Sequence, residues 1–343
     1  MARRPTLRDV AREAGVSIAT VNRVVGGGSV VREETVKRVT EAAARVGYHG
    51  RRLLVRETRD DRPKVRLGFV LHKQKQAFYQ NVVRAIEHAA QAHQTANVEA
   101  EIVFSPSQAP SDVAAHLAEL GQRVDCIAAT AVNHHVVTDQ VKALAENGVE
   151  CISLFSDFAQ GLRRCYLGMN NLKIGRGAAQ MLMTSIKQPG KIALFVGGHR
   201  WHGHELRETG FRTQFRETDT RFELLDTLVN LETRQLTYEA TLELLDRQPD
   251  LRGIYLAGGG MEGAIAALRE ERPPGKINMV VNELTPESRA ALEDGYVSLV
   301  IGTPLDTICR RMVAIMAQVS ADPDSGPRGQ LFLDPRLHLP EFL

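Results

Sequence analysis

The stretch GGGMEG, at residues 258–263, has the glycine spacing of a nucleotide-binding loop. It fits G-x-G-x-x-G, precedes a helix-like segment, and is followed about twenty residues later by Glu283. In a dinucleotide-binding unit such glycines approach a pyrophosphate and the acid binds a ribose, but the motif normally follows the first strand of its sheet. This one lies late in the chain. A nicotinamide-dependent oxidoreductase is therefore one alternative, and a tight strand-to-helix turn is the favoured one.

A second group of chemically capable side chains lies in GGHRWHGHELRE. Its H-x-x-H-x-H spacing matches no established zinc site and has no cysteine nearby, so we expect no metal there. The stretch suits a cleft-lining loop that hydrogen-bonds to a ligand or stacks on it. We find no general base with a supporting partner, which argues against an enzyme. The group comprises His199, Trp201, His202, His204 and Glu205.

Charge is unevenly distributed along the 343 residues. Residues 1–64 contain 15 Lys or Arg and 8 Asp or Glu, a net charge of +7, whereas the remainder carries −5. A basic head on a mildly acidic body predicts that the head binds a polyanion. No apolar run approaches the roughly 18 residues of a membrane span, and the N-terminus lacks the apolar core of a signal peptide. We therefore expect a cytoplasmic protein whose four cysteines are reduced and buried.

The head has the pattern of a helix-turn-helix. In TLRDVAREAGVSIATVNRVVGG, Thr6 can cap a first helix, Gly15 can end it in the left-handed conformation, and Ser17 can cap a second helix. The later segment REETVKRVTEAAARVGY has apolar residues at helical spacing and would complete a three-helix core. A generic small bundle is the alternative, but the turn chemistry and the positive charge both favour DNA binding.

These two segments strongly resemble the DNA-binding head of the LacI/GalR family of transcription regulators. The resemblance implies that the second helix enters the major groove, with Ile18, Ala19 and Arg23 at base edges. It also implies backbone contacts that fix register, although Asn22 could instead reach a base. The residues at these backbone-contact positions are Thr6, Ser17, Thr20, Asn22 and Tyr48.

The segment after the head departs from the family pattern. Relatives continue through a proline into a hinge helix that presents a leucine to the minor groove. Here Gly50 stands at the proline position and Glu57 at the leucine position, and an acid pointed at DNA is unfavourable. We therefore favour a basic linker over residues 51–64, with Arg51 and Arg52 on phosphates, over a wedge helix using a neighbouring leucine.

From residue 65 onward, buried strands alternate with amphipathic helices, as in VRLGFVLH followed by FYQNVVRAIEHAAQAH. This alternation predicts an α/β fold with parallel sheets covered on both faces, and more strands appear than one sheet holds. The body also resembles a periplasmic sugar-binding protein, which implies two lobes around a ligand cleft. By that analogy the first lobe takes residues 65–160 and 297–325, and the second takes 161–296 and 326–343.

The same resemblance implies where an effector binds. Phe78 and Tyr79 stand where relatives pack aromatic rings on a sugar, although they also suit the start of a helix. Arg207 lies in an R-x-x-G-F motif and can form a fork of hydrogen bonds to a ligand. The other candidates are Asn170, Trp201, Asn282 and Glu283.

Two departures bear on the ligand. Gly258 and Gly259 replace the Asn-Asp of the family pattern A-N-D-x-M, and Gly302 precedes Thr303 where relatives often have glutamine. Missing side chains would enlarge that side of the cleft, which favours a ligand larger than, or different from, a plain hexose.

The sequence as a whole predicts a cytoplasmic transcription regulator, expected to be a repressor. A homodimer would place two heads on the half-sites of a palindromic operator. The effector would be a sugar, polyol or sugar derivative, with no cofactor or membrane partner. The oxidoreductase and a free-standing solute-binding protein remain the alternative hypotheses.

Overall fold

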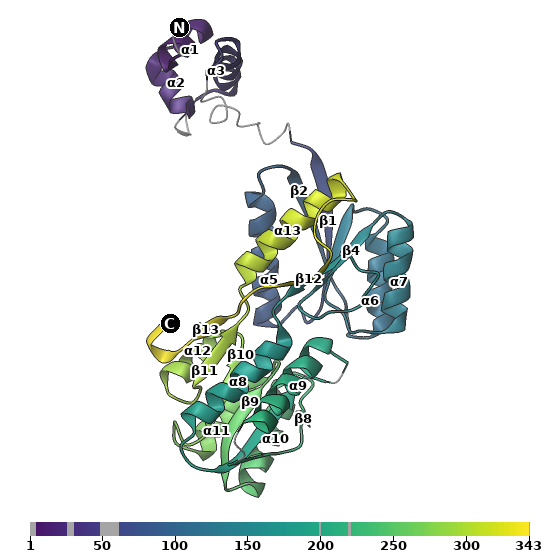
Figure 1. Cartoon of the computed structure of the whole chain (residues 1–343), viewed down its shortest axis with the longest axis vertical. Helices are drawn as coiled ribbons and strands as arrows, with labels where there is room; N and C mark the ends of the chain where they lie inside the picture. Colours follow the sequence, from purple (N-terminus) through teal and green to yellow (C-terminus); the bar gives the residue numbers. More distant parts are fainter. Residues whose placement is uncertain (1–4, 26–30, 49–61, 199, 219–220, 343) are drawn as a thin grey trace. The chain divides into compact units, whose positions relative to one another are not determined.

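The computed structural model describes residues 5–25, 31–48, 62–198, 200–218 and 221–342. The chain divides into two compact units, Met1–Pro63 and Lys64–Leu343 (Figure 1). The predicted contacts of Arg51 and Arg52, and the hinge positions Gly50 and Glu57, lie outside the described residues, as does His199. No described helix is long and apolar enough to span a membrane.

The first unit is the predicted three-helix head. It comprises α1 (Leu7–Ala14), α2 (Ile18–Val25) and α3 (Glu33–Arg45). Gly15 has the left-handed conformation that ends α1, with φ 63° and ψ 37°. Small side chains let the three helices pack closely, and the fully or nearly fully buried core residues are Val10, Ala11, Ala14, Val21, Val39, Ala42 and Ala43.

Hydrogen bonds at the helix ends explain the turn. The Asp9 carboxylate accepts from both the backbone N–H and the hydroxyl of Thr6, each at 2.8 Å, so it caps the start of α1. At α2, the backbone N–H of Thr20 donates to the Ser17 hydroxyl at 3.1 Å. The predicted capping by Ser17 is therefore confirmed.

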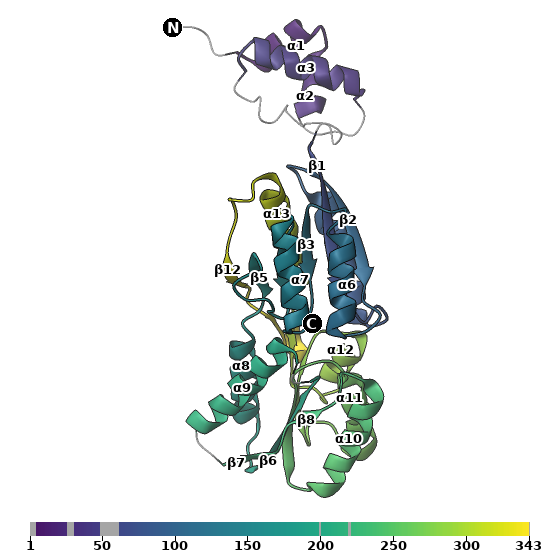
Figure 2. The same ribbon diagram turned by 90° about the vertical axis from the view of Figure 1, so that its right-hand side faces the viewer.

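The first lobe of the body contains a parallel sheet in the order β12-β5-β4-β3-β1-β2 (Figure 2). Apolar side chains of α5 and α13 pack on one face of this sheet, and those of α6 and α7 pack on the other. The strands are β1 (Lys64–Leu71), β2 (Asn97–Phe104), β3 (Cys126–Ala129), β4 (Glu150–Leu154), β5 (Cys165–Gly168) and β12 (Gly329–Phe332). The helices are α5 (Ala77–Ala92), α6 (Pro110–Leu120), α7 (His135–Glu146) and α13 (Leu305–Ala321).

The second lobe has a sheet in the order β13-β11-β10-β9-β6-β7, and β8 also pairs with β6. This sheet is parallel except at its edge, where β13 pairs antiparallel with β11. Helices α8 and α9 cover one face, and α10, α11 and α12 cover the other. The strands are β6 (Gly190–Val196), β7 (Phe222–Leu224), β8 (Leu228–Val229), β9 (Leu251–Leu256), β10 (Asn278–Asn282), β11 (Leu299–Gly302) and β13 (Arg336–His338). The helices are α8 (Asn171–Ser185), α9 (His202–Glu217), α10 (Arg234–Arg247), α11 (Met261–Glu271) and α12 (Pro286–Glu293). A short 3₁₀ turn, Pro340–Phe342, ends the described chain.

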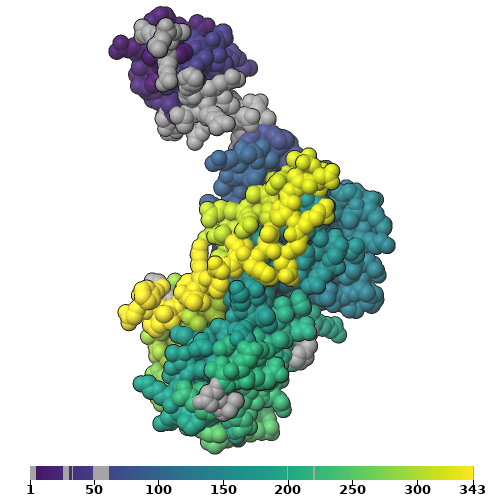
Figure 3. Space-filling model, in the orientation of Figure 1, coloured from purple at the N-terminus to yellow at the C-terminus, as the bar shows by residue number. Residues whose placement is uncertain are grey.

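The crossings between lobes differ from the predicted positions. β5 and β12 belong to the first sheet and β11 to the second, so each crossing lies several residues later than expected. The physical reason is that β5 is only four residues long and follows β4 without an intervening helix, so its sequence gives little signal. In Figure 3 the C-terminal stretch, coloured yellow, crosses the surface from the first lobe to the second.

Two buried arginines hold this C-terminal stretch against the first lobe. Arg163 binds Asp157 through two hydrogen bonds of 2.5 and 2.7 Å and donates to the Gly329 carbonyl at 2.9 Å. Arg164 is fully buried and donates to the Pro323 carbonyl at 2.8 Å. Burial alone would raise the pKa of Asp157, but hydrogen bonds from Arg163 and its polar neighbours hold that pKa below its usual range.

Candidate functional site

The exposed face of α2 carries the residues predicted to read DNA. Val21 is buried in the head core, which turns Ile18, Ala19 and Arg23 outward, and Ile18 is 40% exposed. The Arg23 Nε donates to the Ala19 carbonyl at 3.4 Å, and the side chain remains exposed. An exposed apolar side chain next to an arginine suits base edges, since arginine forks onto guanine and apolar groups contact a thymine methyl.

The predicted backbone-contact residues surround this face. Ser17 and Asn22 are exposed and Thr20 is half-buried, whereas Tyr48 packs partly against the head core. Thr6 is half-buried at the start of α1. A shallow hollow between α2 and α3 gathers further cations that the sequence prediction did not include, Arg32 and Arg38, beside Ser17, Thr20 and Arg23. Clustered arginines are suited to phosphate groups.

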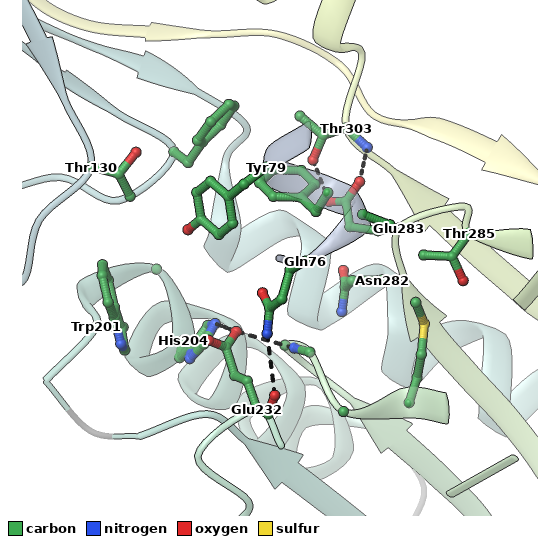
Figure 4. Close-up of a pocket in the computed structure, with 18 of the residues that line it drawn as sticks. Gln76, Tyr79, Thr130, Trp201, His204, Glu232, Asn282, Glu283, Thr285 and Thr303 are labelled. Atoms are coloured by element: carbon green, nitrogen blue, oxygen red, sulfur yellow. Dashed lines mark hydrogen bonds and ion pairs between the residues drawn. The ribbon is translucent and has the colours of Figure 1, made fainter. Parts of the chain in front are cut away.

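A cavity of about 570 Å³ lies between the two lobes of the body (Figure 4). Loops that follow β1, β4, β6, β8, β9, β10 and β11 contribute to its walls. This is the position expected of a ligand site, because open parallel sheets bind ligands beyond the carboxyl ends of their strands. Its volume is that of a site for a small organic molecule.

Six of the seven predicted effector residues line this cavity, namely Phe78, Tyr79, Trp201, Arg207, Asn282 and Glu283. Asn170 is the exception: its side chain accepts from the backbone N–H of Lys173 at 3.1 Å and caps α8. The next residue, Asn171, lines the cavity instead, because successive residues at the helix start point in different directions.

Aromatic rings form one wall of the cavity. The Phe78 ring lies 5.1 Å from that of Tyr79 and 5.3 Å from that of Phe155, both edge to face. The Trp201 ring lies 4.8 Å from the His72 ring, and its indole N–H donates to Gln108 on the first lobe at 3.3 Å. Such a wall can pack against the apolar C–H faces of a ligand.

Arg207 is held by a close contact between α8 and α9. A Cβ at Gly175 would lie 2.0 Å from the Arg207 carbonyl oxygen, and one at Gly210 would lie 2.1 Å from the Leu172 carbonyl oxygen. Only glycine permits this approach, which lets Arg207 Nε donate to the Asn171 side-chain oxygen at 2.8 Å. Arg207 Nη1 also donates to the Ala257 carbonyl at 2.6 Å. The R-x-x-G-F motif thus joins an arginine to the glycine that positions it.

Glu283 lies across the cavity, where both of its carboxylate oxygens face Thr303. The Thr303 backbone N–H donates at 3.1 Å, and the Thr303 hydroxyl donates to the other oxygen. Burial raises the pKa of Glu283 above its usual value, and these hydrogen bonds oppose that shift.

A carboxylate that the sequence prediction missed also lines the cavity. Glu232, from the loop after β8, forms an ion pair with Lys73 of the first lobe, and each of these side chains is 16% exposed. Its other oxygen accepts from the Gly259 N–H at 3.1 Å and lies 3.5 Å from His204 Nε2. Burial alone would raise the pKa of Glu232, but His204, Lys73 and Gly259 together lower it to about 2.

The glycines of GGGMEG provide the space for this carboxylate. A Cβ at Gly258 would lie 2.9 Å from His204, and one at Gly259 would lie 3.1 Å from Glu232. The space left by the missing side chains is therefore partly filled, rather than enlarging the cleft as the sequence suggested. A pyrophosphate would also meet the Glu232 carboxylate here, which counts against dinucleotide binding.

Two histidines in the cavity are neutral near pH 7. Burial lowers the pKa of both His72 and His204 to about 4, despite the nearby Glu232. The Tyr79 hydroxyl is hydrogen-bonded to His72 Nε2. In the part of the chain that the structure describes, no three His, Cys, Asp or Glu side chains gather as a metal site.

Left-handed backbone at non-glycine residues is concentrated around the cavity. Lys73, Phe155, Glu232 and Glu283 have φ values of 53°, 63°, 56° and 72°. Each such residue costs on the order of 1–3 kcal/mol, and such strain commonly persists where a ligand site requires a particular side-chain direction. Phe155, Glu232 and Glu283 line the cavity, and the fourth residue, Lys73, forms an ion pair with Glu232.

Family models match both units. Residues 6–50 match the bacterial regulatory proteins of the lacI family, and residues 67–322 match the periplasmic binding protein domain. Among solved structures, the chain resembles a solute-binding protein from Burkholderia graminis in complex with D-arabinose, with TM-score 0.75 and 18% identity over 81% of this chain and 96% of that one. A glucose-galactose binding protein from Geobacillus stearothermophilus gives TM-score 0.74 and 16% identity over 82% and 99%.

Relatives by sequence are transcription regulators. The regulator GalS of Salmonella typhimurium is 25% identical over 77% of this chain and 75% of its own length. Catabolite control protein A of Priestia megaterium is 33% identical over 43% of this chain and 42% of its own length. The chain belongs to the lacI family of bacterial regulatory proteins, with a helix-turn-helix DNA-binding head and a periplasmic-binding-protein body.

Proposed function

We propose that this regulator is a cytoplasmic repressor that binds a palindromic operator as a homodimer and responds to a sugar-like effector in the cleft. Ile18, Ala19 and Arg23 read base edges, and Arg23 specifies a guanine. The shallow hollow with Arg32 and Arg38 holds phosphates and fixes register. Two heads related by a twofold axis match the symmetry of an inverted repeat.

The observation that carries this proposal is the cavity, with aromatic rings on one wall and hydrogen-bonding groups on the others. Aromatic faces and convergent polar groups together suit a molecule with both C–H faces and hydroxyls. In support, two of the similar solved structures are described as bound to D-arabinose and D-allose.

Effector binding reaches the DNA through the angle between the lobes. Polar contacts already cross the cleft, among them Lys73 to Glu232, Trp201 to Gln108, and the Gly203 N–H to the Ser156 hydroxyl at 3.3 Å. A ligand that binds one lobe angle more tightly shifts the population toward it, and only such differential affinity produces regulation.

The experiment uses the full-length protein and has two arms. Selection from a random duplex library identifies the operator, for which we expect an inverted repeat with guanine contacts. A thermal-shift panel of sugars, polyols, sugar acids, sugar phosphates and nicotinamide dinucleotides then identifies the effector class. A ligand at 100 times its dissociation constant stabilises by about 2.7 kcal/mol, which such an assay detects.

The effector found must also change operator affinity in a binding titration. Selection of sites without twofold symmetry would contradict the homodimer on a palindrome. Stabilisation by dinucleotides alone would contradict the sugar-like effector and revive the oxidoreductase.

A further inference from the structure

Hydrogen-bond acceptors without donors are concentrated in the cavity. Asn282 is 2% exposed, and its amide N–H₂ is fixed by the Leu256 carbonyl at 2.7 Å, which leaves Oδ1 buried without a partner among the described residues. His204 Nδ1 is likewise buried without a partner among them. Both residues line the cavity. Unpaired buried acceptors are costly, so these two atoms indicate a ligand that donates.

The tautomer of His204 follows from its neighbour. Its Nε2 lies 3.5 Å from a Glu232 oxygen, and an ionised carboxylate only accepts hydrogen bonds. The nitrogen that faces Glu232 therefore carries the proton, and Nδ1 is left as a bare acceptor. Glu232 and Glu283 add two carboxylates to the lining of the same cavity (Figure 4).

The Glu232–Lys73 pair presents its negative end to the cavity. Glu232 is among the residues that line the cavity and Lys73 is not. Lys73 therefore contacts the carboxylate on the side away from the cavity, where its positive charge favours the ionised form of Glu232. The position of Glu232 depends on neighbouring glycines, because a Cβ at Gly197 would lie 2.4 Å from Glu232 Cγ, and a Cβ at Gly258 or Gly259 would lie 3.0 or 3.1 Å from the same side chain. Three glycines thus admit a carboxylate from another loop to the place where the family pattern has Asn-Asp.

We propose that Glu232, held by Lys73 beside His204 in the space left by Gly197, Gly258 and Gly259, is the effector-contacting carboxylate, and that it makes the cleft select neutral, hydroxyl-rich molecules over anionic ones. This inference rests on the proposed effector function of the cleft. Hydroxyls donate to Glu232, His204 Nδ1 and Asn282 Oδ1, whereas phosphate dianions and carboxylates have no proton to donate.

The charge balance of the walls agrees with a neutral ligand. Arg207, the arginine predicted to contact the effector, already donates to Asn171 and to the Ala257 carbonyl. If Lys73, which pairs with Glu232, is included, the cavity has as many cationic side chains as acidic ones. The cavity therefore has no net positive charge to attract an anion. These side chains are Lys73, Lys75, Arg207 and Arg234 against Glu232, Glu262, Glu283 and Glu287.

The test compares each neutral sugar with its own anionic derivative on the full-length protein. The probes are D-arabinose, D-allose, D-glucose and myo-inositol, each paired with its monophosphate, and D-glucose also with D-glucuronate. Calorimetric titration should give at least one neutral compound that binds ten-fold or more tightly than its anionic partner. An anionic compound that binds as tightly as its parent would overturn the proposal.

Glu232→Gln keeps the size of the side chain and replaces one acceptor oxygen with a donor. We expect a loss of ten-fold or more in affinity for the neutral compound and a smaller gap to its anionic partner. Unchanged affinity would overturn the role of Glu232. The matched control is Glu243→Gln, which removes an exposed carboxylate paired with Arg247 on α10 of the same lobe and should change neither affinity.

Glu232→Asp provides a second variant should the uncharged side chain disturb folding beside Lys73. It keeps the negative charge, so discrimination against the anionic compound should persist although affinity for the neutral one falls. Equal binding of both compounds by this variant, with the native unfolding midpoint retained, would count against the proposal. If no compound of either charge binds the unmodified protein, the effector function itself fails, and this inference fails with it.

Discussion

The DNA-reading face and the effector cleft are built in different ways. The face lies on a single eight-residue helix, α2. Its outward side chains contribute little to the stability of the fold, because Ile18 and Arg23 are exposed and only Val21 of this helix is buried. The cleft collects side chains from loops of both lobes, and many of these are buried and bonded to one another. We therefore expect changes in the face to alter binding at little cost to stability, and changes in the body to alter stability first.

Among single substitutions, the largest effect is expected for Arg163→Met in the first lobe. This change leaves the 3%-exposed Asp157 carboxylate without its cation, and breaking a buried pair costs about 3–5 kcal/mol. Urea unfolding followed by fluorescence measures the loss, because Trp201 is the only tryptophan and reports on the body. A loss below 1 kcal/mol would show that Ser153, Gln160 and Gln330 suffice to hold Asp157.

Acid should destabilise the body through His72 and His204. Burial lowers the pKa of each from the ordinary 6.5 to about 4, so between these values the unfolded chain binds protons that the folded chain does not. Stability is thus fully present above pH 6.5 and falls as the pH drops toward 4, by on the order of 3 kcal/mol per histidine.

Unfolding midpoints measured at intervals from pH 7 to 4 test this acid effect. His72→Gln should flatten the pH dependence by roughly half, because one of the two titrating groups is gone. A wild-type midpoint that stays constant over this interval would exclude neutral, buried histidines in the cleft.

Arg23→Ala should separate binding from folding in the head. We expect a loss of about 1–3 kcal/mol on the selected operator and a much smaller loss on random duplexes, because a base contact is specific. Anisotropy titrations at fixed salt measure both affinities, and the head's helical circular-dichroism signal should be unchanged. Equal losses on both duplexes would assign Arg23 to a phosphate instead.

The smallest effect is expected for Ser17→Ala at the start of α2. Loss of the hydrogen bond from the Thr20 N–H should cost about 1 kcal/mol of head stability. Thermal unfolding followed by helical circular dichroism measures it, with Ala19→Ser on the exposed face as a control that leaves the cap intact. A loss of body stability as well would contradict the division of the chain into two units.

The same contrast explains which predictions succeeded. The three helices of the head, the ending of α1 at Gly15 and the capping by Ser17 depend on neighbours three or four residues away, so the sequence predicted them correctly. Crossings between the lobes were placed too early, because strands as short as β5 and β12 carry little periodicity. Asn170 and Asn171 could not be told apart, because the direction of a side chain at a helix start depends on local backbone angles.

The sequence by itself determined the helix-turn-helix head, the α/β class of the body and, in the cleft, most of the aromatic residues together with Arg207 and Glu283. These follow from local spacing, from hydrophobic periodicity and from motifs that contain a functional residue together with the residue that positions it. The R-x-x-G-F motif, for example, contains both Arg207 and Gly210. Only the tertiary structure decided that Glu232 lies in the cleft. Its partners Lys73, His204 and Gly259 are distant from it in sequence. The three glycines that leave space for its side chain lie in other loops, so their role is visible only once the chain has folded.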